Sequence, residues 1–203
     1  MEIQRSNLSV DPLSRRFHIY ALLWVTRNCE EAISQILVTK CGVPRQYIQR
    51  GLHLTLYHAR RPLPGLTFGT MPMKLFADIT ETRFMVLAPG GENPRPELEP
   101  SRRSVGIRLT RRNTSIPEVL RLRRSVYQFE TPEVVGRRLP SSDWRNCFGA
   151  RHFQPHIKLL RPGSGVDRDL KKLGVVFRSA LERIEFGKLE VKMAILDDGE
   201  TRF

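Results

Sequence analysis

Apolar and polar residues alternate in several short segments of this chain. A β-branched and aromatic run at residues 16–26 predicts a buried strand, and residues 29–42 follow with the spacing of an amphipathic helix that Gly42 closes. Asn28 is the expected N-cap of this helix. Residues 51–59 alternate leucine with polar side chains, so they predict a strand with one apolar and one polar face.

The second half of the chain repeats this order of elements. Residues 104–110 predict a strand, and residues 115–129 predict a helix with Ser115 as its cap and Pro117 in its first turn. Residues 152–162 then contain a second short strand with alternating apolar and polar positions. The order strand, helix, strand therefore occurs twice, which indicates two similar halves.

Loops and a hairpin are expected between the two halves. Residues 60–72 and 90–103 are rich in proline and glycine and predict loops. Between them, residues 73–79 and 83–89 are apolar and β-prone and are separated by a short turn. We therefore expect them to pair as a β-hairpin.

The last elements complete an α+β pattern. A helix is expected near residues 167–183, and residues 186–196 alternate as a half-solvated antiparallel strand does. The chain has 203 residues, of which 40% are hydrophobic and 8% aromatic, enough to bury one core. We expect a single domain over residues 1–203.

Charge adds a clue about partners. Lys and Arg number 34 against 21 Asp and Glu, giving a formal net charge of +13. Such an excess favours a polyanionic partner, because basic side chains that neutralise phosphates release condensed counterions. The alternative is a basic solvated surface without a dedicated ligand. Arginines are concentrated at residues 60–61, 101–112, 121–124, 136–138 and 149–153. For 121–124 alone we expect the solvated face of a helix.

The remaining composition bears on location and redox state. The three cysteines, Cys29, Cys41 and Cys147, lack CxxC spacing, so we expect reduced thiols rather than disulfides or a zinc site. No run approaches the roughly 18 apolar residues of a membrane span, and the first residues lack the apolar centre of a signal peptide. We therefore expect a cytoplasmic protein with no membrane partner.

Two of the expected strands present similar polar faces. His53 is followed two residues later by Thr55, and His156 by Lys158. Side chains at i and i+2 point to the same side of a strand, so each strand places an imidazole beside a group that can hold a phosphate. Of two imidazoles beside one phosphorus, a neutral one can accept a proton while a protonated one donates. Tyr57 shares the first face, where it either stacks on a base or packs at the rim.

These motifs resemble those of a known family. The sequences HLTL at 53–56 and PHIKLL at 155–160 are similar to the paired His-x-Thr/Ser motifs of the two-histidine phosphoesterase superfamily, and the second is preceded by a family-like FxP at 153–155. The LigT-like members, which include RNA 2′,3′-cyclic phosphodiesterases historically called 2′-5′ RNA ligases, are the most similar group. The strand expected at residues 186–196 also resembles the final strand of this family.

The resemblance implies both a fold and an activity. The fold is bilobal and pseudo-symmetric, with antiparallel sheets around a central groove and helices outside. The activity is metal-independent hydrolysis of a phosphodiester, with His53 and His156 as catalytic residues and Thr55 and Lys158 as substrate-binding residues. Lys158 departs from the family, which usually has Thr or Ser there. A lysine can stabilise phosphate charge, or it can crowd the groove.

The sequence lacks the common motifs for metal and nucleotide-cofactor binding. It contains no HExxH, no carboxylate cluster, no GxxxxGK[ST] and no GxGxxG. We therefore expect neither a metal ion nor a nucleotide cofactor.

Three functional interpretations stay open at this point. The first is a phosphodiesterase acting on a 2′,3′-cyclic phosphate or a 2′-5′ linkage of RNA or an oligonucleotide. The second is an RNA-binding module on the same fold whose catalysis is weak or lost through Lys158. The third is a defence-related enzyme that degrades cyclic oligonucleotides. In each case we expect a monomer.

Overall fold

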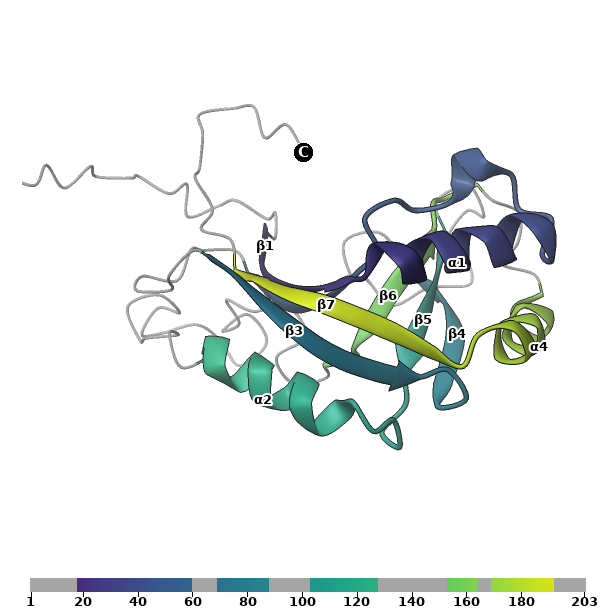
Figure 1. Cartoon of the computed structure of the whole chain (residues 1–203). Helices are drawn as coiled ribbons and strands as arrows, with labels where there is room; N and C mark the ends of the chain where they lie inside the picture. The colour runs from purple at the N-terminus through teal and green to yellow at the C-terminus, as the bar shows by residue number, and fades with distance from the viewer. Residues whose placement is uncertain (1–17, 60–68, 88–102, 128–152, 164–168, 192–203) are drawn as a thin grey trace, which may run out of the picture.

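The computed structural model describes residues 18–59, 69–87, 103–127, 153–163 and 169–191 (Figure 1). The elements in chain order are β1 (His18–Val25), α1 (Arg27–Thr39), the short 3₁₀ helix η1 (Arg45–Tyr47), β2 (His53–Ala59), β3 (Gly69–Asp78), β4 (Thr82–Leu87), β5 (Ser104–Leu109), α2 (Ile116–Tyr127), β6 (His156–Leu160), α4 (Leu170–Ala180) and β7 (Arg183–Val191). The α+β class expected from the sequence is confirmed.

The described strands form one seven-stranded sheet in the order β3-β7-β1-β2-β6-β5-β4, and every neighbouring pair is antiparallel. More than one sheet was expected. The two halves join into one sheet because β2 pairs with β6 at its centre, through a single residue pair in register, Leu54 with Ile157. Figure 1 shows β3 and β7 running across the molecule at a steep angle to β4, β5 and β6.

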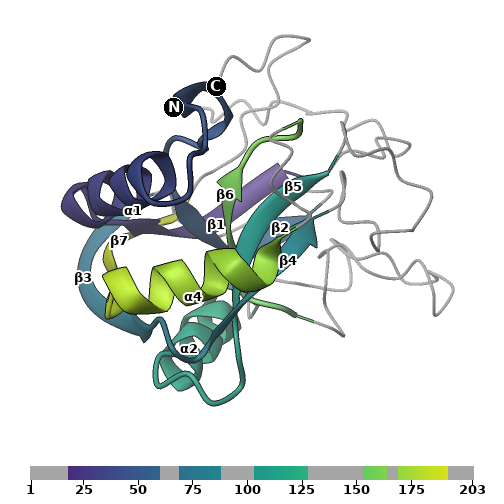
Figure 2. The same ribbon diagram turned by 90° about the vertical axis from the view of Figure 1, so that its right-hand side faces the viewer.

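The repeated order of elements is visible in the sheet. β1, α1 and β2 form one strand-helix-strand unit, and β5, α2 and β6 form the other. In each unit the two strands pair with each other, so the second strands of the two units become the central neighbours β2 and β6. Figure 2 shows the helices of the two units, α1 and α2, at opposite ends of the molecule, with α4 between them in that view.

The N-terminal capping of α1 and α2 differs from the capping predicted from the sequence. Thr26 rather than Asn28 caps α1: its side-chain oxygen accepts the backbone N–H of Cys29 at 3.4 Å, so the helix begins two residues earlier than predicted. Helix α2 begins directly after Ser115 as predicted, but the Ser115 hydroxyl donates to Asn113 Oδ1 at 2.8 Å.

The predicted hairpin between β3 and β4 is wrong. The two strands follow each other closely, yet β3 pairs with β7 at one edge of the sheet and β4 pairs with β5 at the other. Two-residue hairpin turns of types I′ and II′ need a positive φ, and within the described chain only glycines have one, none of them between these strands. The turn is built instead on Asp78, whose carboxylate accepts from the backbone N–H and the hydroxyl of Thr80, both at 2.8 Å.

Strand β3 is also longer than expected. It begins at Gly69, inside the segment 60–72 that predicted a loop, and it includes Pro72. Proline lacks the N–H of a sheet ladder and is confined to edge strands. β3 is an edge strand, so Pro72 is tolerated there.

The core lies on one face of the central strands. Leu54, Leu56, Ile157 and Leu159 are all completely buried and join apolar residues of α1, α2 and α4 in one cluster. The positions between them form the opposite, partly exposed face. Among the described helices, none is long and apolar enough to cross a membrane.

Candidate functional site

The pairing of β2 with β6 brings the four predicted site residues together. Leu54 lies opposite Ile157 in an antiparallel register, so one step along each strand places Thr55 opposite His156 and His53 opposite Lys158. All four side chains point away from the buried leucine and isoleucine face. Directly opposed Cβ atoms are about 5 Å apart and diagonal ones about 7–8 Å. Continued from this one pair, the register makes the two imidazoles diagonal neighbours, at a separation from which both side chains can reach one phosphate group.

The two histidines are held in the same way. Nδ1 of His53 lies 2.8 Å from the carbonyl oxygen of Gly51, and Nδ1 of His156 lies 2.8 Å from the carbonyl oxygen of Gln154. A carbonyl oxygen only accepts, so each Nδ1 carries the hydrogen of that bond. In both rings Nε2 is then the nitrogen that takes up or releases a proton.

Glu30 of α1 fixes the backbone that holds His53. Its carboxylate oxygens accept the backbone N–H groups of Gly51 at 2.8 Å and Leu52 at 3.2 Å. Gly51 adopts a φ of +66°, and a Cβ there would lie 3.1 Å from the indole ring of Trp24. Glycine is therefore required at this turn on both conformational and steric grounds.

Trp24 forms the wall of the site on the β1 side. It lies opposite His53 in the β1–β2 register, with ring centroids 5.4 Å apart and an interplanar angle of 64°. Its Nε1 donates to Glu190 at 2.5 Å, and Nζ of Lys188 lies 5.3 Å from its ring centroid and 3.7 Å from the Glu190 carboxylate. The sequence analysis did not single out Trp24 or Glu190, although Trp24 lies in the predicted buried strand at 16–26 and Glu190 in the alternating strand at 186–196.

Arg108 lies on the other side of the site. The β5–β6 register places it opposite His156, where its guanidinium donates to the side chain of Gln154 at 3.0 Å. The arginine-rich segment 101–112 was noted from the sequence, but only the register shows that this one residue lies beside a motif histidine.

Lys158 is partly buried on the same face. Burial, and then repulsion from nearby Arg161, lower the pKa of its ammonium group. Gly106 lies opposite it on β5, where a Cβ would come within 2.6 Å of the Ile157 carbonyl oxygen. Lys158 is therefore a cation between β2, where His53 lies opposite it, and β5, where Gly106 presents no side chain.

Arg123 connects helix α2 to β2 and to Phe153, which precedes β6. It is buried, donates to the backbone carbonyl of Leu56 in β2, and lies over the Phe153 ring at 4.1 Å. The expectation that 121–124 forms a solvated helix face holds for Arg121, which is exposed and pairs with Glu118 at 2.6 Å. It is wrong for Arg123.

Several other predictions can be placed against the structure. Tyr57 is completely buried, so it packs and does not stack on a bound base in this conformation. Cys29 and Cys41 are free thiols whose pKa values burial raises, which makes them poor nucleophiles. Cys147 and the arginines at 60–61, 136–138 and 149–151 lie outside the described residues. Within the described ranges, no three His, Cys, Asp or Glu side chains are grouped as metal ligands would be.

We also compared the chain with protein-family models, curated proteins and solved structures, and none of them matches.

Proposed function

We propose that the chain is a metal-independent phosphodiesterase acting on RNA or oligonucleotide phosphodiesters, at a 2′,3′-cyclic phosphate or a 2′-5′ linkage. One observation carries the proposal. His53 and His156, 103 positions apart in the sequence, are diagonal neighbours on one face of adjacent strands, and each Nδ1 is bonded to the carbonyl two residues before it. Both rings then use Nε2 for proton transfer, as an acid/base pair requires.

The reaction needs one proton accepted and one donated. With a 2′,3′-cyclic phosphate, the neutral imidazole takes a proton from water as the water oxygen bonds to phosphorus. The bond between phosphorus and one ribose oxygen breaks, and the protonated imidazole donates its proton to that oxygen. The reaction consumes one water and leaves the two histidines with exchanged protonation states, which solvent then restores.

The neighbouring side chains suit a phosphate between the histidines. The Thr55 hydroxyl can donate to a non-bridging oxygen, and Lys158 and Arg108 supply positive charge on either side of His156. Charge-assisted contacts of this kind stabilise the charge that develops on the oxygens in the transition state.

We further propose that the two strand-helix-strand units are the lobes of a two-histidine phosphoesterase fold. The support is their matching order and the central position of β2 and β6, which carry the two motifs. A groove between such lobes would run along the polar face of these strands.

The test uses His53→Ala and His156→Ala with a panel of 2′,3′-cyclic, 2′-5′ and 3′-5′ linked substrates. General acid/base groups contribute about 10²- to 10⁴-fold each, so each variant should lose at least about a hundredfold in kcat while its circular dichroism stays unchanged. Excess chelator should leave the wild-type rate unaltered. Full activity of either variant would reject this site.

The RNA-binding alternative is favoured by one observation, the lysine opposite His53. If Lys158 prevents catalysis, the wild type binds RNA in a salt-dependent way without cleaving any linkage. Lys158→Thr, which restores the residue type usual in the resembled family, would then generate cleavage.

A further inference from the structure

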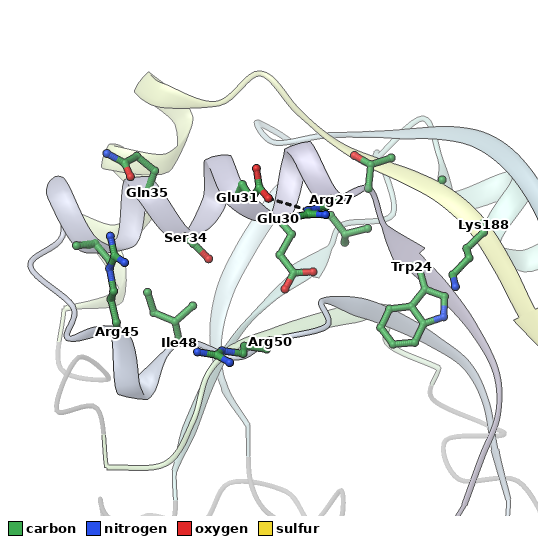
Figure 3. A pocket seen from close by; sticks show the side chains of 14 residues that line it. Trp24, Arg27, Glu30, Glu31, Ser34, Gln35, Arg45, Ile48, Arg50 and Lys188 are labelled. Atoms are coloured by element: carbon green, nitrogen blue, oxygen red, sulfur yellow. Dashed lines mark hydrogen bonds and ion pairs between the residues drawn. The ribbon is translucent and has the colours of Figure 1, made fainter. Parts of the chain in front are cut away.

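An open cavity of about 1060 Å³ lies next to the two-histidine face, between α1 and the segment 45–50 (Figure 3). Trp24 and Lys188 are at one end of it, and Arg45 is at the other. Neither histidine lines it. Its volume is at the upper end of the range of about 300–1,000 Å³ typical of small-molecule sites, so it has room for a nucleotide and not merely for an ion.

Two of the cations that line this cavity, Arg45 and Arg50, have no ion pair among the described residues. Arg27 pairs with Glu31 at 2.9 Å. Within the part of the chain that the structure describes, no carboxylate pairs with the guanidinium of Arg45 or Arg50, and both residues are exposed. Glu30 extends from α1 toward Arg50 (Figure 3), but its carboxylate already accepts hydrogen bonds from the backbone N–H groups of Gly51 and Leu52.

The cavity also has apolar surface suited to a base. Val38 of α1 and Ile48 line it. Figure 3 shows Ile48 between Arg45 and Arg50, and Trp24 at the far end. Apolar walls with a few convergent polar groups are typical of ligand sites, and phosphate contacts from arginine fix the position of a bound strand.

Trp24 joins this cavity to the histidines. It lines the cavity, and its ring packs edge-on against His53 at 5.4 Å. A phosphate held at the histidines therefore has the cavity immediately beyond Trp24. The next nucleotide of a longer substrate would either continue past Trp24 into the cavity or lead away from it.

We propose that the cavity binds the nucleotide next to the scissile phosphate of a short single-stranded RNA, with Arg45 and Arg50 holding its phosphate and the apolar wall receiving its base. The inference rests on the proposed function, and it specifies the substrate: an oligonucleotide is preferred to a nucleoside 2′,3′-cyclic monophosphate.

The test compares two substrates, a nucleoside 2′,3′-cyclic monophosphate and an RNA hexamer ending in a 2′,3′-cyclic phosphate. Arg45→Ala/Arg50→Ala should lower kcat/KM for the hexamer by about tenfold or more, mainly through KM, because two charge-assisted phosphate contacts are lost. The mononucleotide should be hydrolysed at the wild-type rate. Lys171→Ala/Arg178→Ala on α4 removes the same charge from exposed positions outside the cavity and should leave both rates unchanged.

A second variant separates the cavity from charge alone. Ser34 of α1 lines it, and Ser34→Trp fills part of the space without changing the net charge. This variant should also lose the hexamer preference and keep the mononucleotide rate. Equal hexamer rates in wild type, Arg45→Ala/Arg50→Ala and Ser34→Trp would overturn the inference while leaving the proposed function intact.

If the wild type hydrolyses neither substrate, the proposed function fails and binding tests the cavity by itself. Fluorescence anisotropy with a labelled hexamer lacking the cyclic phosphate then measures affinity against salt. Loss of both arginines should weaken binding and reduce the slope of log K against log[salt] by about 0.7, since the two side chains hold one phosphate and each neutralised single-strand phosphate contributes about 0.7. An unchanged affinity and slope would overturn the inference.

Discussion

Replacing Glu30 with glutamine tests how α1 holds the turn before His53. The carboxylate accepts two backbone N–H groups, from Gly51 at 2.8 Å and Leu52 at 3.2 Å, and the carbonyl of Gly51 in turn holds His53 Nδ1. Glutamine keeps the shape of the side chain but has one accepting oxygen. Its amide group donates, so it leaves one of the two backbone donors without an acceptor.

The size of the effect follows from these two bonds. Hydrogen bonds to a charged group contribute about 1.5–3 kcal/mol each, and an unsatisfied donor costs about 1–3 kcal/mol. Water can reach this turn, because Glu30 and Gly51 are only partly buried, so we take the lower end of these ranges. We expect Glu30→Gln to reduce the free energy of unfolding by about 2 kcal/mol, which lowers Tm by about 4–8 °C in a domain of this size.

Urea unfolding monitored by circular dichroism measures the change, with Glu31→Gln as the matched control. Glu31 is the next residue of the same helix, and its side chain is 64% exposed in an ion pair with Arg27. Exposed pairs of this kind contribute at most about 0.5 kcal/mol. Unfolding free energies of the two variants that agree within about 0.5 kcal/mol would refute the role assigned to Glu30.

Two further predictions concern β6, which carries the second motif, and its neighbour β5. Gly106→Ala should destabilise the fold by about 1–3 kcal/mol, because its Cβ would meet the Ile157 carbonyl oxygen at 2.6 Å, whereas Gly69→Ala, with nothing within 4 Å, should be nearly neutral in the same unfolding assay. Burial and Arg161 lower the pKa of Lys158 from its ordinary 10.5, so protonation of this lysine costs stability in the folded state, and its contribution to the wild-type unfolding free energy should rise as the pH increases toward 10.5. Lys158→Met should remove that rise, so its unfolding free energy relative to wild type should be more favourable at pH 7 than at pH 10; a difference that stays constant with pH would contradict the assignment.

Local patterns predicted the elements of this fold well, because they depend on neighbours in the chain. The alternation around His53 and His156 correctly separated a buried face from a polar one, since successive strand residues point to opposite sides. The α1 cap was missed by two residues, although Thr26 and Asn28 are both capping residue types. The difference in N-cap preference between threonine and asparagine is too small to decide which of them caps the helix without knowledge of the backbone conformation.

Strand pairing was harder to predict from the sequence. Strands β3 and β4 were predicted to pair because they are adjacent in sequence, but β3 pairs with β7, more than a hundred residues later, and β4 pairs with the following strand, β5. Arg123 was expected in solvent, and its burial depends on the Leu56 carbonyl and the Phe153 ring, which come from other elements. Contacts of this kind have no periodic signal in the sequence.

The sequence by itself determined the α+β class, the repeated strand-helix-strand order and the polar faces that carry His53, Thr55, His156 and Lys158, because each of these follows from residue type and local period. The tertiary structure decided that β2 and β6 are neighbours and in which register they pair. That register makes the two histidines a diagonal pair, and the β1–β2 register brings Trp24 beside His53, because the position of a strand in a sheet depends on long-range burial rather than on its own residues.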